Sequence, residues 1–277
     1  MYTPFPLILC YHAVGSALPS GLSVPVETLD RQLSLLRRRG YVGLTFAESE
    51  QRRLARTLDK RTVVVTFDDG FASTLLAKPV LEEAGFPATV FVPTHFIDTG
   101  GPLSYAARNT PELSYEDELR PLTWEQLGRL RDGGWEIGSH TVNHSRLPEL
   151  SDADLVHELE VSRSTIEQRF GRCETIAYPY GLADARVAVA AQRVGYLAGC
   201  TLTAGHRVDE RFRRARVGLY PFDTGLRLRA KFSPTFRSVR RTRLAGLAQF
   251  ARAHVRPGST EPVGGRPLDA DTDSESP

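Results

Sequence analysis

Two pairs of polar side chains in this sequence are of the types that hydrolytic metal sites use. Asp68 and Asp69 are adjacent and precede Gly70, and His140 and His144 are four residues apart. Two imidazoles and one carboxylate leave open coordination positions on a metal, as a catalytic zinc site requires. Adjacent carboxylates repel each other, and a cation bound to one of them relieves that repulsion. The two pairs together therefore predict a metal site in which one Asp binds the cation and the other faces a bound water.

Each pair alone also has a simpler interpretation. Asp-Gly dipeptides mark turns, so Asp69-Gly70 alone is typical of a loop. His140 and His144 would share one face of a helical turn, or they are two unrelated loop histidines. A two-histidine, one-carboxylate iron oxygenase is a rival interpretation of the same ligands, but it leaves Asp68 without a role.

The positions of the motifs relative to the predicted strands strengthen the prediction of a site. His12, Asp68, His140 and Tyr180 each follow a strand-like run directly or within a few residues. In a parallel α/β barrel the carboxyl ends of the strands lie on one face, and that face holds the active site. Motifs that are distant in the sequence are therefore expected to converge in space.

Strand-like and helix-like runs alternate along most of the chain, which is typical of βα units and a mostly parallel sheet. Short apolar or β-branched runs predict strands at 7–11, 62–67, 88–92, 135–137, 175–178 and 196–201. Apolar residues at helical spacing, with capping residues at the ends, predict helices at 26–39, 71–84, 123–133, 151–170 and 183–194. The sequence thus predicts an α/β fold.

The composition excludes several classes of protein. The 277 residues are 41% hydrophobic and 25% charged, which is ordinary for a globular chain and excludes a disordered or fibrous one. A net charge of +2 does not indicate nucleic-acid binding. The cysteines Cys10, Cys173 and Cys200 form no Cys-x-x-Cys pair, so no disulfide framework is predicted. Because we find neither an apolar run of about 18 residues nor a signal segment, we expect a cytoplasmic protein.

Three motifs together resemble those of a known family. The runs TFDDG at 66–70, HTVNH at 140–144 and AYPYG at 177–181 look like the ordered motifs of the polysaccharide deacetylases, carbohydrate esterase family 4. The early Tyr11-His12 pair resembles the circularly arranged branch that includes the poly-N-acetylglucosamine deacetylases. The resemblance covers about residues 7–220 and implies a distorted (β/α) barrel of about seven parallel strands.

The resemblance also implies an activity and a cofactor. The family hydrolyses the N-acetyl group of N-acetylated amino sugars or glycans and releases acetate. It uses one divalent metal, for which nitrogen and oxygen ligands favour zinc and also suit cobalt, nickel or iron. Residues that match the family's metal ligands are Asp69, His140 and His144.

Three further residues receive roles from the resemblance. Asp68 is implied as the general base that takes a proton from the bound water. His12 is implied as the acid that protonates the leaving amine, since the family's late Leu-x-Ile-His motif is absent. The backbone N–H of Tyr180 is implied as a donor to the oxyanion. Side chains that are candidates either for aromatic walls against sugar rings or for core packing are Phe71, Trp124, Tyr178 and Tyr180.

One departure from the family pattern motivates an alternative function. The family carries an arginine before the Pro-aromatic pair of its third motif, whereas Ala177 and Tyr178 precede Pro179 here. A glycan-binding protein with impaired catalysis is therefore an alternative. A second alternative keeps the chemistry and changes the substrate, as a deformylase or deacetylase of a lipid-linked or nucleotide sugar.

The C-terminal third differs in composition from the rest. Residues 207–243 contain twelve Lys or Arg against three acids, a local net charge of +9. This segment predicts a solvated, Arg-rich helix, or a weak association with an anionic surface. We therefore divide the chain into a catalytic barrel at 1–225, a basic helical segment at 226–254 and a disordered tail at 255–277. The expected partner is an N-acetylated sugar, with no nucleic acid.

Overall fold

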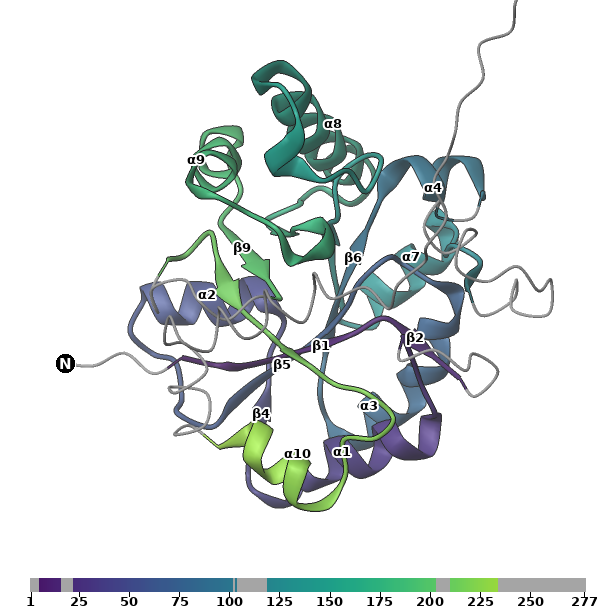
Figure 1. The fold of residues 1–277 in the computed structure, drawn as a ribbon. Helices are drawn as coiled ribbons and strands as arrows, with labels where there is room; N and C mark the ends of the chain where they lie inside the picture. Colours follow the sequence, from purple (N-terminus) through teal and green to yellow (C-terminus); the bar gives the residue numbers. More distant parts are fainter. Residues whose placement is uncertain (1–4, 16–21, 102, 104–118, 203–209, 234–277) are drawn as a thin grey trace, which may run out of the picture.

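The computed structural model describes residues 5–15, 22–101, 103, 119–202 and 210–233 (Figure 1). A parallel sheet curls into a barrel, with helices around its outside. Neighbouring strands are hydrogen-bonded in the order β10-β9-β8-β7-β6-β5-β1-β11, and β4 also pairs with β5. The expected α/β barrel is confirmed, with eight described strands along this path where about seven were predicted.

The strands have the following bounds: β1 Leu7–Tyr11, β4 Val42–Gly43, β5 Thr62–Phe67, β6 Ala88–Val92, β7 Glu136–Ser139, β8 Thr175–Ala177, β9 Ala198–Thr201, β10 Arg214–Ala215 and β11 Val217–Gly218. A second, two-stranded sheet consists of β2 Ala13–Val14 and β3 Ser23–Val24. The predicted strands at 7–11, 62–67 and 88–92 are confirmed to the residue. β7 begins one residue later than expected and extends through Ser139.

The helices are α1 Val26–Arg38, α2 Phe46–Leu54, α3 Lys78–Ala84, α4 Thr94–Thr99, α7 Trp124–Asp132, α8 Asp152–Phe170, α9 Ala185–Val194 and α10 Gly225–Phe232. Short 3₁₀ turns cover Ala72–Ala77, Leu147–Glu149 and Pro179–Gly181. Residues 71–84 were predicted as one helix, but a 3₁₀ turn precedes α3. Pro79 explains the break, because it lacks an N–H and its ring would clash with the carbonyl four residues earlier.

The barrel closes through one short segment of chain. β10 pairs with β9 at one edge, and β11 pairs with β1 at the other. Arg216 is the single residue between β10 and β11. The same stretch of chain therefore joins the first and last strands of the sheet, and Arg216 lies at that seam.

Apolar side chains fill two regions. The larger cluster lies between the strands and the outer helices and includes Leu9, Leu33 and Val65. A smaller cluster, with Ile8, Val64 and Phe91, lies on the other face of the same strands and fills the barrel. Alternate residues of a strand point to opposite faces, so β1 and β5 supply both clusters.

Helix α2 covers the amino end of the barrel. Its Phe46 side chain belongs to the inner cluster. The backbone N–H of Ala47 donates to Glu136, the first residue of β7. Glu50, fully buried, forms an ion pair with Arg214 of β10 at 2.8 Å. The opposite, carboxyl end of the strands is where the polar motifs of the sequence emerge.

The domain division proposed from composition stays a prediction. α10 occupies the start of the basic segment, and Leu228 and Phe232 pack it against the main core. Residues 207–209, 234–254 and the tail at 255–277 lie outside the described residues. In the described part of the chain, no helix combines the length and hydropathy needed to span a bilayer.

Candidate active site

The predicted metal ligands meet beyond the carboxyl ends of β5 and β7. Asp69 Oδ1 lies 3.3 Å from Nε2 of His140 and 3.2 Å from Nε2 of His144. All three residues are buried, with exposed fractions of 1%, 1% and 8%. One ligand atom from each lies within 4.8 Å of the other two. This set of two imidazole nitrogens and one carboxylate oxygen fits a zinc-type cation.

Backbone geometry, rather than a helix, brings the two histidines together. Residues 140–146 form a loop, so the helical turn considered for His140 and His144 is not present. Asp69, Thr141 and His144 have φ angles of 70°, 70° and 56°. Left-handed backbone is unfavourable for residues with a Cβ and persists where surrounding contacts impose it. The two rings end 4.8 Å apart.

Hydrogen bonds and burial prepare the ligands for a cation. His140 Nδ1–H donates to the Ala177 carbonyl at 2.7 Å, which orients the ring so that Nε2 faces Asp69. Burial favours a raised pKa for Asp69, but hydrogen bonds from the two imidazoles hold it well below its ordinary value. Burial also lowers the pKa of His144, which favours the neutral imidazole that binds metals. Although burial opposes it, the Asp68 and Asp69 carboxylates raise the pKa of His140.

The loop that carries the histidines is fixed by one carboxylate from α8. Glu158 Oε2 accepts from the backbone N–H groups of Val142 and Asn143 at 2.8 and 2.9 Å. Its Oε1 accepts from Asn143 Nδ2 and from Ser145 Oγ, both at 2.9 Å. Glu158 is 4% exposed. One buried side chain therefore holds the backbone between the two histidine ligands, and the sequence analysis did not identify it.

The Asp68 carboxylate faces Arg216 at the barrel seam. Arg216 Nη1 and Nη2 donate to its two carboxylate oxygens, each at 2.6 Å. Arg216 Nη1 also donates to Thr66 Oγ1 at 2.9 Å. Burial alone would raise the pKa of Asp68, but the Arg216 guanidinium, assisted by His140, lowers it. The carboxylate is therefore ionised at neutral pH and held in one orientation.

Arg216 is a second residue of this centre that the sequence analysis did not identify. The expected arginine is absent before Pro179, and Arg216 provides the guanidinium from the barrel seam instead. Its two-residue spacing from Arg214 is no signal, because Arg211 and Arg213 have the same spacing. Within 207–243 Arg216 was therefore not separated from the other arginines.

His12 lies beside this carboxylate and is half-buried. One of its ring nitrogens, one Asp68 oxygen and Cys10 Sγ all lie within 4.8 Å of one another. Two carboxylates, three histidines and an arginine from distant parts of the chain thus form one polar centre, as the strand-end argument predicted.

The chain that forms this centre is similar to known proteins in sequence and in fold. The profile described as polysaccharide deacetylase matches residues 55–199, a stretch that contains Asp68, Asp69, His140 and His144. The chain belongs to the polysaccharide deacetylase family. The matched stretch is just over half of the chain.

Individual relatives agree with this assignment. The Bacillus subtilis (strain 168) putative polysaccharide deacetylase YxkH is 29% identical to this chain over 204 residues. The aligned part is 72% of this chain and 64% of YxkH, so the chain spans less than two thirds of that relative. The Streptococcus pyogenes deacetylase PplD, solved in complex with acetate, is 25% identical with a TM-score of 0.72, over 84% of this chain and all of PplD. IcaB from Ammonifex degensii shares the fold at 22% identity and a TM-score of 0.63, over 85% of this chain and 97% of IcaB.

Tyr180 is the exposed aromatic residue at the deacetylase centre. Its side chain is 40% exposed, and its ring centroid lies 4.7 Å from that of His144. Its φ of 58° turns the chain sharply after Pro179. Phe71 and Tyr178 are fully buried, and Trp124 packs against Phe170 between α7 and α8. Of the four aromatic candidates, Tyr180 is thus the one that is exposed beside the predicted metal ligands.

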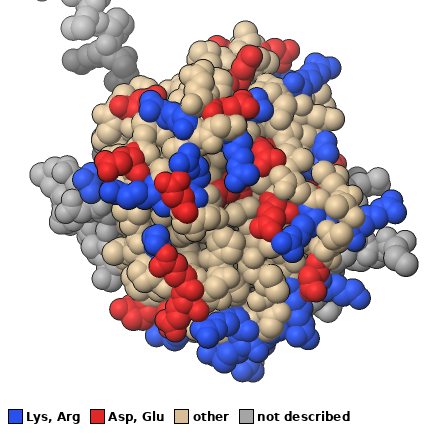
Figure 2. All heavy atoms as spheres, turned by 180° about the vertical axis from the view of Figure 1, so that it is seen from behind, with Lys and Arg blue, Asp and Glu red and all other residues tan. Residues whose placement is uncertain are grey.

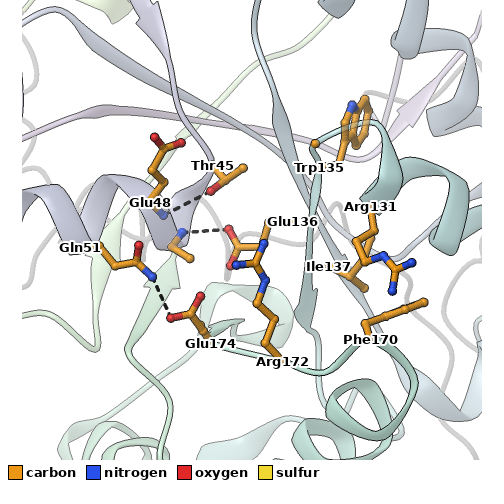
Figure 3. Close-up of a pocket in the computed structure, with 12 residues that line it drawn as sticks. Thr45, Glu48, Gln51, Arg131, Trp135, Glu136, Ile137, Phe170, Arg172 and Glu174 are labelled. Carbon is orange, nitrogen blue, oxygen red and sulfur yellow. Dashed lines mark hydrogen bonds between the residues drawn. The ribbon is translucent and has the colours of Figure 1, made fainter.

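A separate cavity of about 230 Å³ lies at the other end of the deacetylase barrel (Figure 3). Its lining includes Glu136 at the start of β7, whereas His140 follows the end of that strand. Glu136 accepts hydrogen bonds from Thr89, Thr175 and the backbone of Ala47. Burial raises the pKa of Glu136 despite these bonds. The cavity therefore belongs to the contacts between α2 and the strands rather than to the centre around Asp68 and Asp69.

Proposed function

We propose that this protein is a metal-dependent N-deacetylase that releases acetate from an N-acetylated amino sugar or glycan. Asp69, His140 and His144 would hold one divalent cation, for which their donor atoms favour zinc. The observation that carries the proposal is the convergence of these ligands beside a second carboxylate, Asp68, which is held separately by Arg216. A single-carboxylate oxygenase site has no use for that second, oriented carboxylate.

A cation held by Asp69, His140 and His144 would supply Lewis acidity toward the acetamide carbonyl and would make a water more acidic. Asp68 takes a proton from that water as general base. Arg216 keeps Asp68 ionised and prevents its rotation, because both carboxylate oxygens accept hydrogen bonds from it. The same contacts limit the basicity of Asp68, so it acts as a weak base toward an acidified water.

His12 gives a proton to the amide nitrogen as the C–N bond breaks, so that an amine rather than an amide anion leaves. The backbone N–H of Tyr180 donates to the oxyanion that forms on the carbonyl oxygen. The proton that Asp68 receives is released with the acetate and amine products. The position of His12 beside Asp68 supports the first assignment, and the proximity of Tyr180 to His144 supports the second.

The presence of Arg216 argues against the impaired glycan-binding alternative. That alternative depended on the missing arginine of the third motif, and here the guanidinium reaches the base from another strand. The acetate in the PplD structure supports acetyl as the acyl group. A deacetylase or deformylase of a lipid-linked or nucleotide sugar remains the second candidate for the substrate.

The distribution of charged side chains on the surface indicates which classes of partner the protein could bind. Figure 2 shows acidic and basic side chains interspersed on the face opposite to that of Figure 1. Such mixing gives no reason to add a nucleic-acid partner on that face. Exposed Arg227 and Arg229 on α10 support weak contact of the basic segment with an anionic surface.

The test of the proposed function is acetate release. Purified protein, stripped of metal and reloaded with zinc, cobalt or nickel, is incubated with acetylated chito-oligosaccharides and with N-acetylated sugar nucleotides. We expect acetate with at least one substrate, only after metal is restored. No acetate with any substrate or metal, from protein that binds zinc, would contradict the proposal.

A further inference from the structure

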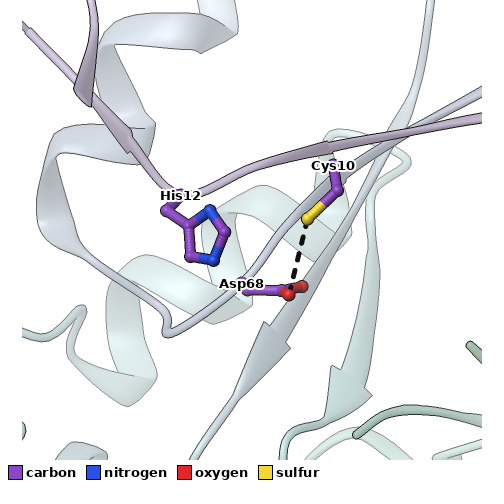
Figure 4. A group of neighbouring side chains, drawn as sticks. All are labelled: Cys10, His12 and Asp68. Atoms are coloured by element: carbon purple, nitrogen blue, oxygen red, sulfur yellow. Dashed lines mark hydrogen bonds between the residues drawn. The ribbon is translucent and has the colours of Figure 1, made fainter. Parts of the chain in front are cut away.

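A second group of potential metal ligands lies next to the first and shares none of its residues. It consists of Cys10, His12 and Asp68, and Figure 4 shows the thiol and the carboxylate facing each other with the imidazole beside them. Cys10 Sγ is 3.5 Å from Asp68 Oδ2. One ligand atom from each residue lies within 4.8 Å of the other two. A zinc ion bonded to all three atoms would draw them closer together.

The fold fixes this group through two neighbouring strands. Cys10 belongs to β1 and is paired in register with Thr66 of β5. Asp68 follows β5, and its backbone N–H donates to the Tyr11 carbonyl at 3.0 Å. His12 directly follows β1 and is the most exposed of the three. The group thus has two buried, rigidly placed members and one that faces the outside.

The donor set differs from that of the first group. Sulfur, imidazole nitrogen and carboxylate oxygen are all zinc ligands, and a thiolate favours softer cations such as cadmium. Arg216 occupies one direction of each Asp68 oxygen, but each oxygen has a further lone pair. Burial raises the pKa of the Cys10 thiol well above its ordinary value. A cation must therefore displace the thiol proton, so this site binds zinc more weakly than the Asp69 site.

We propose that Cys10, His12 and Asp68 form a second, inhibitory cation site that takes zinc or cadmium when the metal is in excess. Binding exchanges the S–H bond of Cys10 for an S–metal bond, with the proton released to solvent and no change in oxidation state. The same event occupies the lone pairs of Asp68 and His12. The inhibition, but not the binding, rests on the proposed function, in which those two residues move protons.

Metal binding is tested first, without any activity measurement. Wild-type protein in excess zinc should retain a second equivalent on equilibrium dialysis, and Cys10→Ser should lose it. Cys173→Ser is the matched control, because Cys173 is an equally buried cysteine that precedes β8 at the opposite end of the barrel. Cobalt should give a thiolate-to-metal charge-transfer band in the wild type and in His140→Ala, and no band in the double variant His140→Ala, Cys10→Ser.

Activity then tests the inhibition. Excess zinc should suppress acetate release by the wild type and by Cys173→Ser. In Cys10→Ser, measured relative to that variant's own activity at low zinc, the inhibitory zinc concentration should rise about tenfold or more, the scale of losses in metal-site variants. If Cys10→Ser does not fold, Cys10→Ala replaces it in these experiments, and thermal unfolding checks that this variant is folded.

A second equivalent of zinc that persists in both Cys10 variants, or a wild type without the cobalt–thiolate band, would overturn the assignment of the site. If no substrate yields acetate, the proposed function fails, while dialysis and the cobalt spectrum still decide whether the second site exists.

Discussion

Removing the charge of Glu158 should weaken metal binding without touching a metal ligand. In the variant Glu158→Gln the side chain keeps its shape and can still accept from the backbone N–H groups of Val142 and Asn143. The new amide group must then face Asn143 Nδ2 and Ser145 Oγ, which both donate at present. The Ser145 hydroxyl can rotate and the Asn143 amide can flip so that both accept, which preserves the geometry while the charge is lost.

The size of the effect follows from the two backbone bonds. Hydrogen bonds to a charged group stabilise by about 1.5–3 kcal/mol and neutral ones by about 0.5–1.5 kcal/mol. Losing the charge at both bonds therefore destabilises the loop by about 2 kcal/mol. Since about 1.4 kcal/mol corresponds to a tenfold change in a binding constant, zinc affinity should fall by about 10- to 30-fold. The smaller, tenfold decrease in zinc affinity is expected if the loop is destabilised in the metal-free protein as well.

The assay is competition for zinc between the protein and a chromophoric chelator, followed by acetate release at saturating zinc. We expect weaker binding in Glu158→Gln with turnover near that of the wild type once the site is filled. Glu160→Gln is the matched control, because Glu160 lies on the same helix and is exposed. Zinc affinity equal to that of the wild type in a folded Glu158→Gln protein would refute the role given to this clamp.

Three further predictions concern the catalytic centre. Asp68→Asn should lower acetate release by about 10²- to 10⁴-fold, the range for removal of a general base. The zinc content of the Asp69 site should be unchanged. Normal turnover in this variant would show that Asp68 is not the base. His140→Ala should lose the zinc of that site and with it the activity, as measured by metal analysis, and unchanged zinc content would contradict the ligand assignment. Arg216→Met should raise the pKa of Asp68, because the guanidinium is the main group that lowers it. The ionised base is present above its pKa, so the acid limb of the activity profile should move to higher pH, and Arg216→Lys should move it less. An unshifted limb in a folded Arg216→Met protein would show that Asp68 does not control it.

Sequence patterns located the parts of this fold in which local and tertiary preferences agree. β1, β5 and β6 were predicted to the residue, because uninterrupted apolar or β-branched runs ended at polar or proline residues. α2 was missed because its sequence, FAESEQRRL, presents few apolar residues at helical spacing. Its formation depends on Phe46 entering the barrel and on the ion pair of Glu50 with Arg214.

The candidate site was predicted where a motif is contiguous and missed where it is assembled by the fold. Asp68, Asp69, His140 and His144 lie in two short runs, so residue type and spacing were enough to bring them forward. Arg216 is far from Asp68 in the sequence, and nothing local distinguishes it from neighbouring arginines. The helical turn considered for the histidine pair was not found, because Glu158 imposes a loop from a helix that follows it.

The seam of the barrel has a consequence for how activity is acquired. Arg216 stands where the last strand segments join the first strand, and it is also the group that orients the proposed base. A chain whose sheet is still open at this edge has its ligand loops but lacks the guanidinium beside Asp68. During refolding, zinc capture by the ligand loops is therefore expected to precede turnover, which returns only when the final edge of the sheet docks.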